Sequence, residues 1–178
     1  MNALVTPKRG CLGDIKWVGF DVDGVMTDGG IIISDSGEES KRFHSRDGHG
    51  LKMLLRAGVE VAIITGRQSQ VVANRARELG IKDTRQGVFN KLAAYEAILN
   101  EKGLSHSQTA FAGDDVVDLP ILTRCGLAMA PADACPEALA AAHFVAKAKG
   151  GHGAVREMVE FILKSQGLWD DLLAKYRF

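Results

Sequence analysis

Short apolar runs alternate with segments of helical periodicity along most of this chain. Apolar runs that end at polar residues predict strands buried on both faces. Segments in which apolar residues recur every three or four positions predict helices, and a glycine follows several of them. This alternation is typical of βαβ units and predicts an α/β fold with a doubly wound parallel sheet. The expected strands are 16–20, 60–65, 81–86, 109–112, 127–130 and 144–146, and the expected helices are 51–56, 69–79, 89–102, 116–123, 134–142 and 154–166.

One segment departs from this alternation, between the first strand and the first helix. Gly-Gly-Ile-Ile-Ile at 29–33, a turn-forming cluster at 34–37 and an extended run to Phe43 predict a protruding β-hairpin over about 29–44. Three consecutive isoleucines cannot all face one side of a strand, so the hairpin would expose apolar surface that a second subunit is expected to cover. Residues 47–50 are then expected to cap the helix 51–56.

The composition fits one domain and excludes several classes of partner. The chain has 178 residues, of which 46% are hydrophobic, and 22 basic and 22 acidic residues give a net charge of zero. That balance offers no electrostatic footprint for nucleic acid, and no apolar run approaches the ~20 residues that cross a bilayer. The N-terminus lacks the apolar region of a signal peptide, and three cysteines without metal-ligand spacing give no disulfide framework. We therefore expect a cytoplasmic protein without nucleic-acid or membrane partners, with a leader over 1–14, one domain over 15–166 and a tail over 167–178.

Polar residues end three of the expected strands. Asp21 and Asp23 follow the first strand and leave it on the same face, because side chains alternate along a strand. Thr65 ends the next buried run, and Asp114 and Asp115 follow the strand 109–112. Taken alone, the Asp pair fits an exposed turn as well as a site. Ligands of parallel sheets bind beyond the carboxyl ends of the strands, however, so all of these side chains should line one crevice.

The residue types in this crevice indicate phosphoryl chemistry. Two carboxylates this close need a cation between them or a shared proton, which indicates Mg²⁺ or an acid–base pair. Lys91, at the start of an expected helix, adds an ammonium group, and threonine and lysine are typical partners of phosphate. One carboxylate can attack phosphorus to form an aspartyl-phosphate, while a second protonates the leaving oxygen and later activates water.

The chain order of these residues resembles the haloacid dehalogenase superfamily of phosphatases. That order is Asp21-x-Asp23-Gly, then Thr65, then Lys91, then Asp114. Receiver domains of two-component signalling use similar groups around Mg²⁺ but in the order acidic pair, Asp, Thr, Lys. The order therefore disfavours a receiver-like phosphoacceptor, and the presence of every group disfavours a non-catalytic regulatory protein. The gaps between the motifs leave no room for a cap domain.

Longer motifs resemble one family of that superfamily, the 3-deoxy-D-manno-octulosonate 8-phosphate phosphatases. The matching stretches are 21–29, 37–43, 47–50, 64–67, 113–118 and 150–157. Members of this family are Mg²⁺-dependent tetramers without a cap domain, and they release the free sugar acid and phosphate on the way to lipopolysaccharide. The resemblance implies a Rossmann-like haloacid dehalogenase core, a Mg²⁺ cofactor, a small sugar-acid phosphate as substrate and a homotetramer.

The resemblance also implies a role for each matching residue. Asp21 would be the nucleophile and a metal ligand, and Asp23 would be the general acid/base, with its backbone carbonyl on the metal. Asp114 would be the third protein ligand of Mg²⁺. Thr65, Gly66 and Lys91 would hold the phosphoryl oxygens, and Asp115 and Asp118 would orient the metal shell or Lys91.

The substrate's own carboxylate calls for a further cation. Arg67 is the first candidate, because a guanidinium matches a carboxylate, and Arg156 and Lys149 follow, with exposed surface residues as the alternative. Related phosphatases for nine-carbon ulosonate 9-phosphates often carry an acidic residue at the position of Arg67, so this residue favours the eight-carbon substrate. A phosphatase for another sugar-acid phosphate is the alternative. Without a cap, we expect the hairpin and the C-terminal segment to exclude water by acting between subunits.

Overall fold

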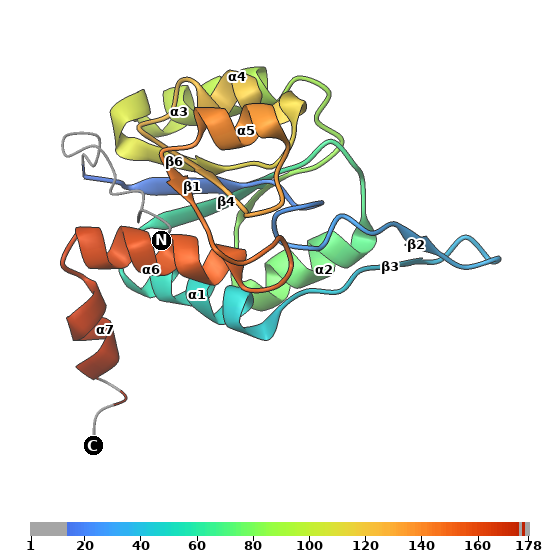
Figure 1. Cartoon of the computed structure of the whole chain (residues 1–178), viewed down its shortest axis with the longest axis horizontal. Coiled ribbons are helices and arrows are strands. Elements are labelled where there is room, and N and C mark those ends of the chain that lie inside the picture. The colour runs from blue at the N-terminus through green and yellow to red at the C-terminus, as the bar shows by residue number, and fades with distance from the viewer. Residues whose placement is uncertain (1–13, 175, 177–178) are drawn as a thin grey trace.

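A six-stranded parallel sheet lies between two layers of helices in this computed structural model, which describes residues 14–174 and 176 (Figure 1). The strand order is β5-β4-β1-β6-β7-β8, and every pairing in the sheet is parallel. The predicted doubly wound α/β fold is confirmed. The strands are β1 (Trp17–Phe20), β4 (Glu60–Ile64), β5 (Asp83–Arg85), β6 (Thr109–Ala112), β7 (Leu127–Ala130) and β8 (Phe144–Val145).

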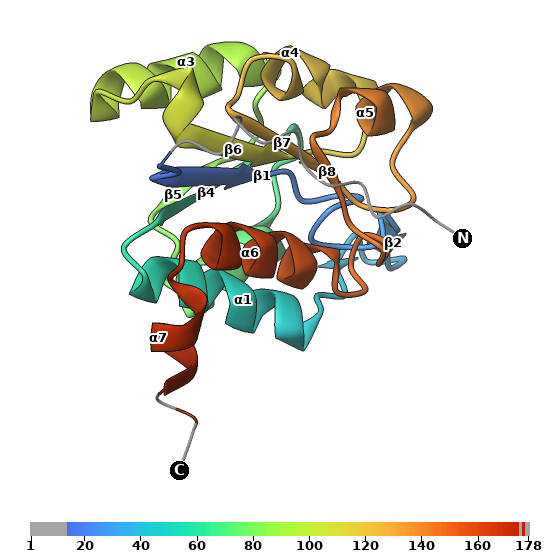
Figure 2. The ribbon, with the colours of Figure 1, turned by 60° about the vertical axis from the view of Figure 1, so that its left-hand side comes forward.

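The two helical layers bury opposite faces of the sheet (Figures 1 and 2). Each layer has its own apolar core, and β1, β4, β6 and β7 are buried over nearly their whole length, as their continuous apolar runs require. One layer holds α3 (Lys91–Lys102), α4 (Leu119–Leu122) and α5 (Pro136–Ala141), and the other holds α1 (Ser45–Arg56), α2 (Gln70–Leu79) and α6 (Ala154–Ser165).

Polar side chains cap the starts of α2 and α3. Ser69 accepts a hydrogen bond from the Val72 N–H at the start of α2, and Asn90 accepts one from the Ala93 N–H at the start of α3. Because Asn90 is the cap, Phe89 lies outside the helix predicted for 89–102 and is fully exposed.

The expected cap at 47–50 is wrong, because α1 begins at Ser45 and Asp47 lies in its first turn. The Asp47 carboxylate caps another helix: it accepts hydrogen bonds from the backbone N–H groups of Gly153 (3.3 Å) and Arg156 (2.8 Å) at the start of α6. This contact joins segments more than a hundred residues apart, so no local pattern could have indicated it.

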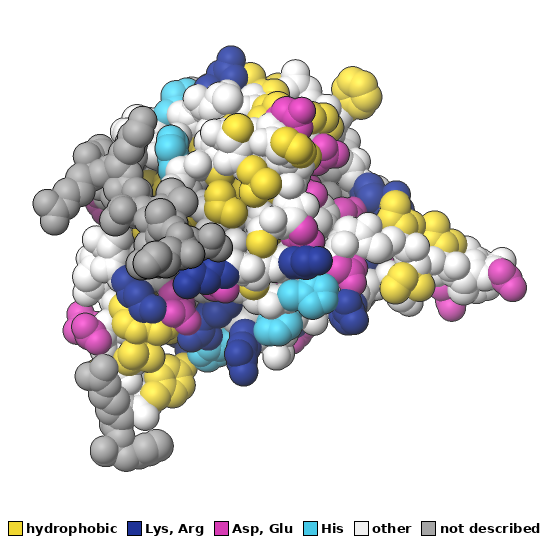
Figure 3. Space-filling view, viewed as in Figure 1, with side chains coloured by type: hydrophobic (Ala, Val, Ile, Leu, Met, Phe, Trp, Pro, Cys, Tyr) yellow, Lys and Arg dark blue, Asp and Glu magenta, His cyan; other side chains and the backbone are white. Residues whose placement is uncertain are grey.

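The predicted hairpin projects from the body of the molecule (Figures 1 and 3). Its strands, β2 (Ile32–Ile33) and β3 (Glu39–Ser40), pair antiparallel, and Ile31, Ile32 and Ile33 are 56%, 55% and 58% exposed. Only this hairpin and α1 separate β1 from β4 in the described residues, so no cap domain covers the ends of the strands.

The C-terminal segment packs against the body over part of its length. Helix α7 (Trp169–Ala174) places Leu172 in the core beneath α6, while residues 175, 177 and 178 lie outside the described part of the chain. The expected leader also lies outside it, apart from Asp14. Among the helices of the described residues, none has the length and apolar character needed to span a bilayer.

Candidate active site

A cleft of about 460 Å³ opens where β1, β4 and β6 end, at the carboxyl edge of the sheet. It gathers most of the side chains that the sequence placed there. The predicted residues in its lining are Asp21, Asp23, Thr65, Gly66, Arg67, Lys91, Asp114 and Asp115. Three apolar residues, Val88, Phe89 and Val117, also line it, and Phe89 and Val117 are exposed.

Asp21 lies at the floor of the cleft and is nearly buried. Its backbone N–H donates to the Ala112 carbonyl and so extends the pairing of β1 with β6. The Lys91 ammonium lies 3.0 Å from Asp21 Oδ1. Burial raises the pKa of Asp21 to about 6, with repulsion from Asp118 adding to the rise and Lys91 opposing it. The carboxylate is therefore held next to a cation in a position where water has little access.

Asp118 is fully buried and does not line the cleft, but it accepts hydrogen bonds from Lys91 and from the turn after β6, which both line it. Its Oδ1 accepts a hydrogen bond from Lys91 Nζ at 2.8 Å. Its Oδ2 accepts from the backbone N–H groups of Asp114 (3.1 Å) and Asp115 (3.4 Å). Lys91 is thus bound between two carboxylates, and the turn after β6 is held in place.

Asp114 supplies a carboxylate of which one oxygen has no hydrogen-bond donor beside it in the described part of the chain. Its Oδ1 is buried without a hydrogen-bond partner, and burial, followed by repulsion from Asp21 and Asp118, raises the pKa of Asp114 to about 7. One carboxylate oxygen from each of these three residues lies within 4.8 Å of the others. Because both oxygens of Asp118 are already engaged, Asp21 and Asp114 are the pair free to bind a divalent cation.

Gly24 makes room for the Asp114 carboxylate. Its φ of +90° suits glycine, and a Cβ there would lie 2.0 Å from Asp114 Oδ2. Gly150 allows a close approach to the Gly24 backbone, because a Cβ on it would lie 1.8 Å from the Gly24 carbonyl oxygen. The loop before α6 therefore packs backbone to backbone against the loop after β1. The turn that carries Asp21 and Asp23 is therefore packed against Asp114 at Gly24 and against the loop before α6, which fits a metal-binding turn.

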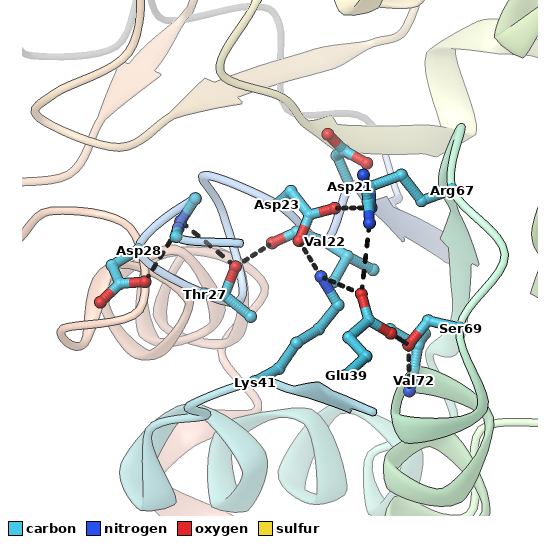
Figure 4. Close-up of polar contacts among 12 residues, drawn as sticks. Asp21, Val22, Asp23, Thr27, Asp28, Glu39, Lys41, Arg67, Ser69 and Val72 are labelled. Atoms are coloured by element: carbon cyan, nitrogen blue, oxygen red, sulfur yellow. Dashed lines mark hydrogen bonds and ion pairs between the residues drawn. The ribbon is translucent and has the colours of Figure 1, made fainter. Parts of the chain in front are cut away.

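Asp23 belongs to a ring of four alternating charges (Figure 4). Lys41 Nζ lies 2.5 Å from Asp23 Oδ1 and 3.4 Å from Glu39 Oε1. Arg67 closes the ring, with Nε 3.8 Å from Asp23 Oδ2 and a terminal nitrogen 3.5 Å from Glu39 Oε1. Sequence reasoning missed Glu39 and Lys41. Both lie in the motif 37–43, but nothing local shows that the hairpin stem folds back onto Asp23.

Of the other predicted residues that line the cleft, Thr65 is buried and Asp115 is exposed. Thr65 is buried at the end of β4, and its carbonyl accepts a hydrogen bond from the Val88 N–H. Asp115 is exposed, and its carboxylate caps the short 3₁₀ helix Val116–Asp118 by accepting from the Val116 N–H at 2.7 Å.

Arg156 does not line the cleft in this structure. Its guanidinium donates to Glu160 at 2.8 Å and lies over the ring of Trp169. It lines a separate cavity of about 450 Å³, together with His44 and His152. Lys149 is exposed in the neighbouring loop and does not line the cleft either.

Comparison with known proteins places this geometry in a family. Residues 83–158 match the model of the haloacid dehalogenase-like hydrolases. The chain is 46% identical over 153 residues to the 3-deoxy-D-manno-octulosonate 8-phosphate phosphatase of Yersinia pestis, covering 86% of this chain and 82% of that protein.

Solved structures agree with this placement. The Moraxella catarrhalis phosphatase of the same name, in complex with magnesium ion, phosphate ion and a KDO molecule, matches with a TM-score of 0.92 at 38% identity, covering 94% of this chain and 96% of that one. The cobalt-bound enzyme from Haemophilus influenzae matches with a TM-score of 0.84 at 43% identity, covering 88% and 92%. The chain belongs to the 3-deoxy-D-manno-octulosonate 8-phosphate phosphatase family of haloacid dehalogenase-like hydrolases.

Proposed function

We propose that this protein is a Mg²⁺-dependent phosphomonoesterase that hydrolyses 3-deoxy-D-manno-octulosonate 8-phosphate to 3-deoxy-D-manno-octulosonate and phosphate, a step towards lipopolysaccharide. The observation that carries the proposal is the meeting of Asp21, Asp23, Thr65, Lys91 and Asp114 in one cleft at the ends of three strands. The family relationship supports the choice of substrate.

The two carboxylates of the loop after β1 divide the chemistry in this proposal. Asp21 attacks phosphorus, the phosphorus–oxygen bond to the sugar breaks, and Asp23 donates a proton to the departing alkoxide. In the second step Asp23 takes a proton from the water that attacks the aspartyl-phosphate, and Asp21 is regenerated as phosphate leaves. Bound Mg²⁺, held by Asp21, Asp114 and the backbone carbonyl of Asp23, would neutralise charge on the phosphoryl group.

The remaining side chains position the phosphoryl group. Lys91 is held within 3.0 Å of Asp21 and is bound from behind by Asp118, so its ammonium is placed to bind a phosphoryl oxygen as Asp21 attacks. Thr65 and Gly66 also line the cleft and are proposed to bind the other phosphoryl oxygens. Asp118 and Asp115 are proposed to support Lys91 and the metal-binding turn.

Arg67 is the residue we propose for recognition of the sugar carboxylate. It lines the cleft and is 44% exposed, and its guanidinium already interacts with two carboxylates. A basic group here favours the eight-carbon acid over a nine-carbon ulosonate 9-phosphate. Arg156 does not line the cleft within one chain, so its predicted role in binding the substrate stays a prediction.

We further propose a cytoplasmic homotetramer. The exposed isoleucines of the hairpin support a barrel-like contact between subunits, and the exposed Phe89 and Val117 at the mouth of the cleft support a cover supplied by a neighbour's C-terminal segment. Such a cover would exclude water in place of the missing cap.

A phosphate-release panel with Mg²⁺ tests the substrate. It compares 3-deoxy-D-manno-octulosonate 8-phosphate with a nine-carbon ulosonate 9-phosphate and with simple sugar phosphates, and the eight-carbon compound is expected to have the highest kcat/KM. A higher value for the nine-carbon acid would replace the proposed substrate with the alternative.

The variant Asp21→Asn tests the nucleophile. It is expected to abolish turnover, a loss of more than ~10⁴-fold, because an amide cannot form the aspartyl-phosphate. Asp35→Asn, in the exposed turn of the hairpin, is the matched control and should keep wild-type activity. Phosphate release at the wild-type rate by Asp21→Asn would contradict the assignment. A long-lived phospho-aspartate formed from acetyl phosphate without turnover would support a receiver-like phosphoacceptor instead.

A further inference from the structure

The stem of the hairpin supplies a buried cation to the loop that follows β1. The Lys41 side chain is 1% exposed, an unusual position for an ammonium group, and its nearest acceptor is Asp23 Oδ1 at 2.5 Å. Glu39 lies on its other side at 3.4 Å. A lysine that served only to hold the hairpin could do so from the surface, so its burial against Asp23 calls for a role at that residue.

Lys41 engages only one of the two oxygens of Asp23. The ion-pair partner of Oδ2 among the described residues is the Arg67 guanidinium, whose Nε lies 3.8 Å away, which is longer than a hydrogen bond. The side chain of Asp23 is 22% exposed, and it lines the cleft. The short contact with Lys41 on Oδ1 restricts the rotation of the carboxyl group, and Oδ2 is left without a hydrogen bond to Lys41. Asp23 therefore binds Lys41 through Oδ1, while Oδ2 can interact with a substrate in the cleft.

The rest of the ring holds Lys41 itself. Glu39 accepts a hydrogen bond from the Ser69 hydroxyl, and Ser69 caps α2 by accepting from the Val72 N–H (Figure 4). The stem of the hairpin is thus bound to the start of α2 as well as to Asp23. These contacts link the start of α2 to the Asp23 carboxyl group through Glu39 and Lys41, so a helix of the body helps to set the position of that group.

We propose that Lys41 is the positioning residue for Asp23, directing its free oxygen towards the leaving oxygen of the substrate. The inference rests on the proposed function, because it needs Asp23 as the group that moves the proton. Among the described residues, the ion-pair partners of Lys41 are Asp23 and Glu39, and neither Asp21 nor Asp114 is one of them. Its loss should therefore affect the proton transfers and leave the attack of Asp21 on phosphorus intact.

Two substrates separate these effects in the full-length protein with Mg²⁺. The alkoxide that leaves the sugar-acid 8-phosphate needs a proton, whereas 4-nitrophenolate leaves without one. In Lys41→Met, a single turnover of the sugar-acid phosphate should release sugar ~10²-fold more slowly, the cost of a misplaced acid. With 4-nitrophenyl phosphate, the same variant should release one nitrophenolate per active site at the wild-type rate. A steady state ~10²-fold below wild type should follow, because water activation also needs Asp23.

The controls distinguish positioning from loss of structure. Lys41→Arg keeps a cation and should restore most of the sugar-acid rate, whereas Arg42→Met removes the neighbouring exposed cation, which binds Asp28, and should behave as wild type. The amplitude of the nitrophenolate burst counts folded active sites. An equal loss of the first step with both substrates, or an unchanged rate on the sugar-acid phosphate, would overturn the role of Lys41.

The two proposals fail in different ways. A wild-type protein that hydrolyses 4-nitrophenyl phosphate and another alkyl phosphate, but not the sugar-acid phosphate, would contradict the proposed substrate alone. The comparison for Lys41 then runs with that alkyl phosphate, because the leaving alkoxide has the same need for a proton.

Discussion

At the scale of single residues, the cleft stores negative charge that the protein alone does not compensate. Asp114 carries an orphaned buried oxygen, and its pKa of about 7 lies beside the pKa of about 6 of Asp21. Both values are raised chiefly because burial disfavours the charged form. A cation bound between the two carboxylates would remove this penalty, and protons compete with that cation for the same oxygens.

Mg²⁺ affinity should therefore rise with pH. Near pH 5.5 both carboxyl groups hold protons that the metal must displace, while near pH 8 both are ionised and no proton is released. Affinity should increase by up to about tenfold per pH unit for each proton displaced. Calorimetric titration of the metal-free protein, in buffers of different ionisation enthalpy, measures both the affinity and the number of protons. A constant affinity between about pH 5.5 and pH 8 would contradict the raised pKa values.

Residues that follow strands could be predicted to line the cleft, as could Lys91 at the start of a helix, whereas the residues of the hairpin stem that contact Asp23 could not. The shared location of Asp21, Thr65 and Asp114 can be predicted because the carboxyl ends of parallel strands lie at one edge of the sheet. Lys41 reaches Asp23 only after the hairpin stem folds back onto the loop. The partners of a charged side chain across such a distance depend on tertiary packing, which neither periodicity nor motif order reports.

At the scale of elements, α1 and α6 are joined by a cap that one helix supplies to the other. The Asp47 carboxylate, on α1, is almost fully buried and accepts from two backbone N–H groups at the start of α6. These donors would otherwise lack partners, since Gly153, at the N-cap position of α6, has no side chain to accept them. The sequence signal for a cap at this position was real, but it belonged to a different helix.

Asp47→Ala should lower the free energy of unfolding by about 1–2 kcal/mol, the usual cost of losing a helix cap. The effect should come from α6 separating from α1, so hydrogen exchange of the amides of Gly153 and Arg156 should accelerate most. Urea unfolding measures the total, with Asp35→Ala in the exposed hairpin turn as the matched control. A loss no larger than that of the control would show that water satisfies the two N–H groups equally well.

At the scale of the whole molecule, two apolar surfaces are left without cover in the described chain. One is the hairpin, where three successive isoleucines are more than half exposed, and the other is the mouth of the cleft around Phe89. The length of the hairpin and its apolar character were predictable, because the run of isoleucines and the turn cluster are local. The exposure of Phe89 was not, because its place depended on which residue caps α3.

Ile32→Asp should break the assembly if the hairpin is a subunit contact. A charge in the middle of that apolar strand would have to be buried against a neighbour, which costs far more than it does in water. Sedimentation should show the wild type as a tetramer and Ile32→Asp as smaller species, and phosphate release should fall because the cleft loses the cover that excludes water. Ser36→Asp places the same charge in the hairpin turn and should leave both assembly and activity unchanged. A fully active wild-type monomer would show instead that each chain closes its own cleft.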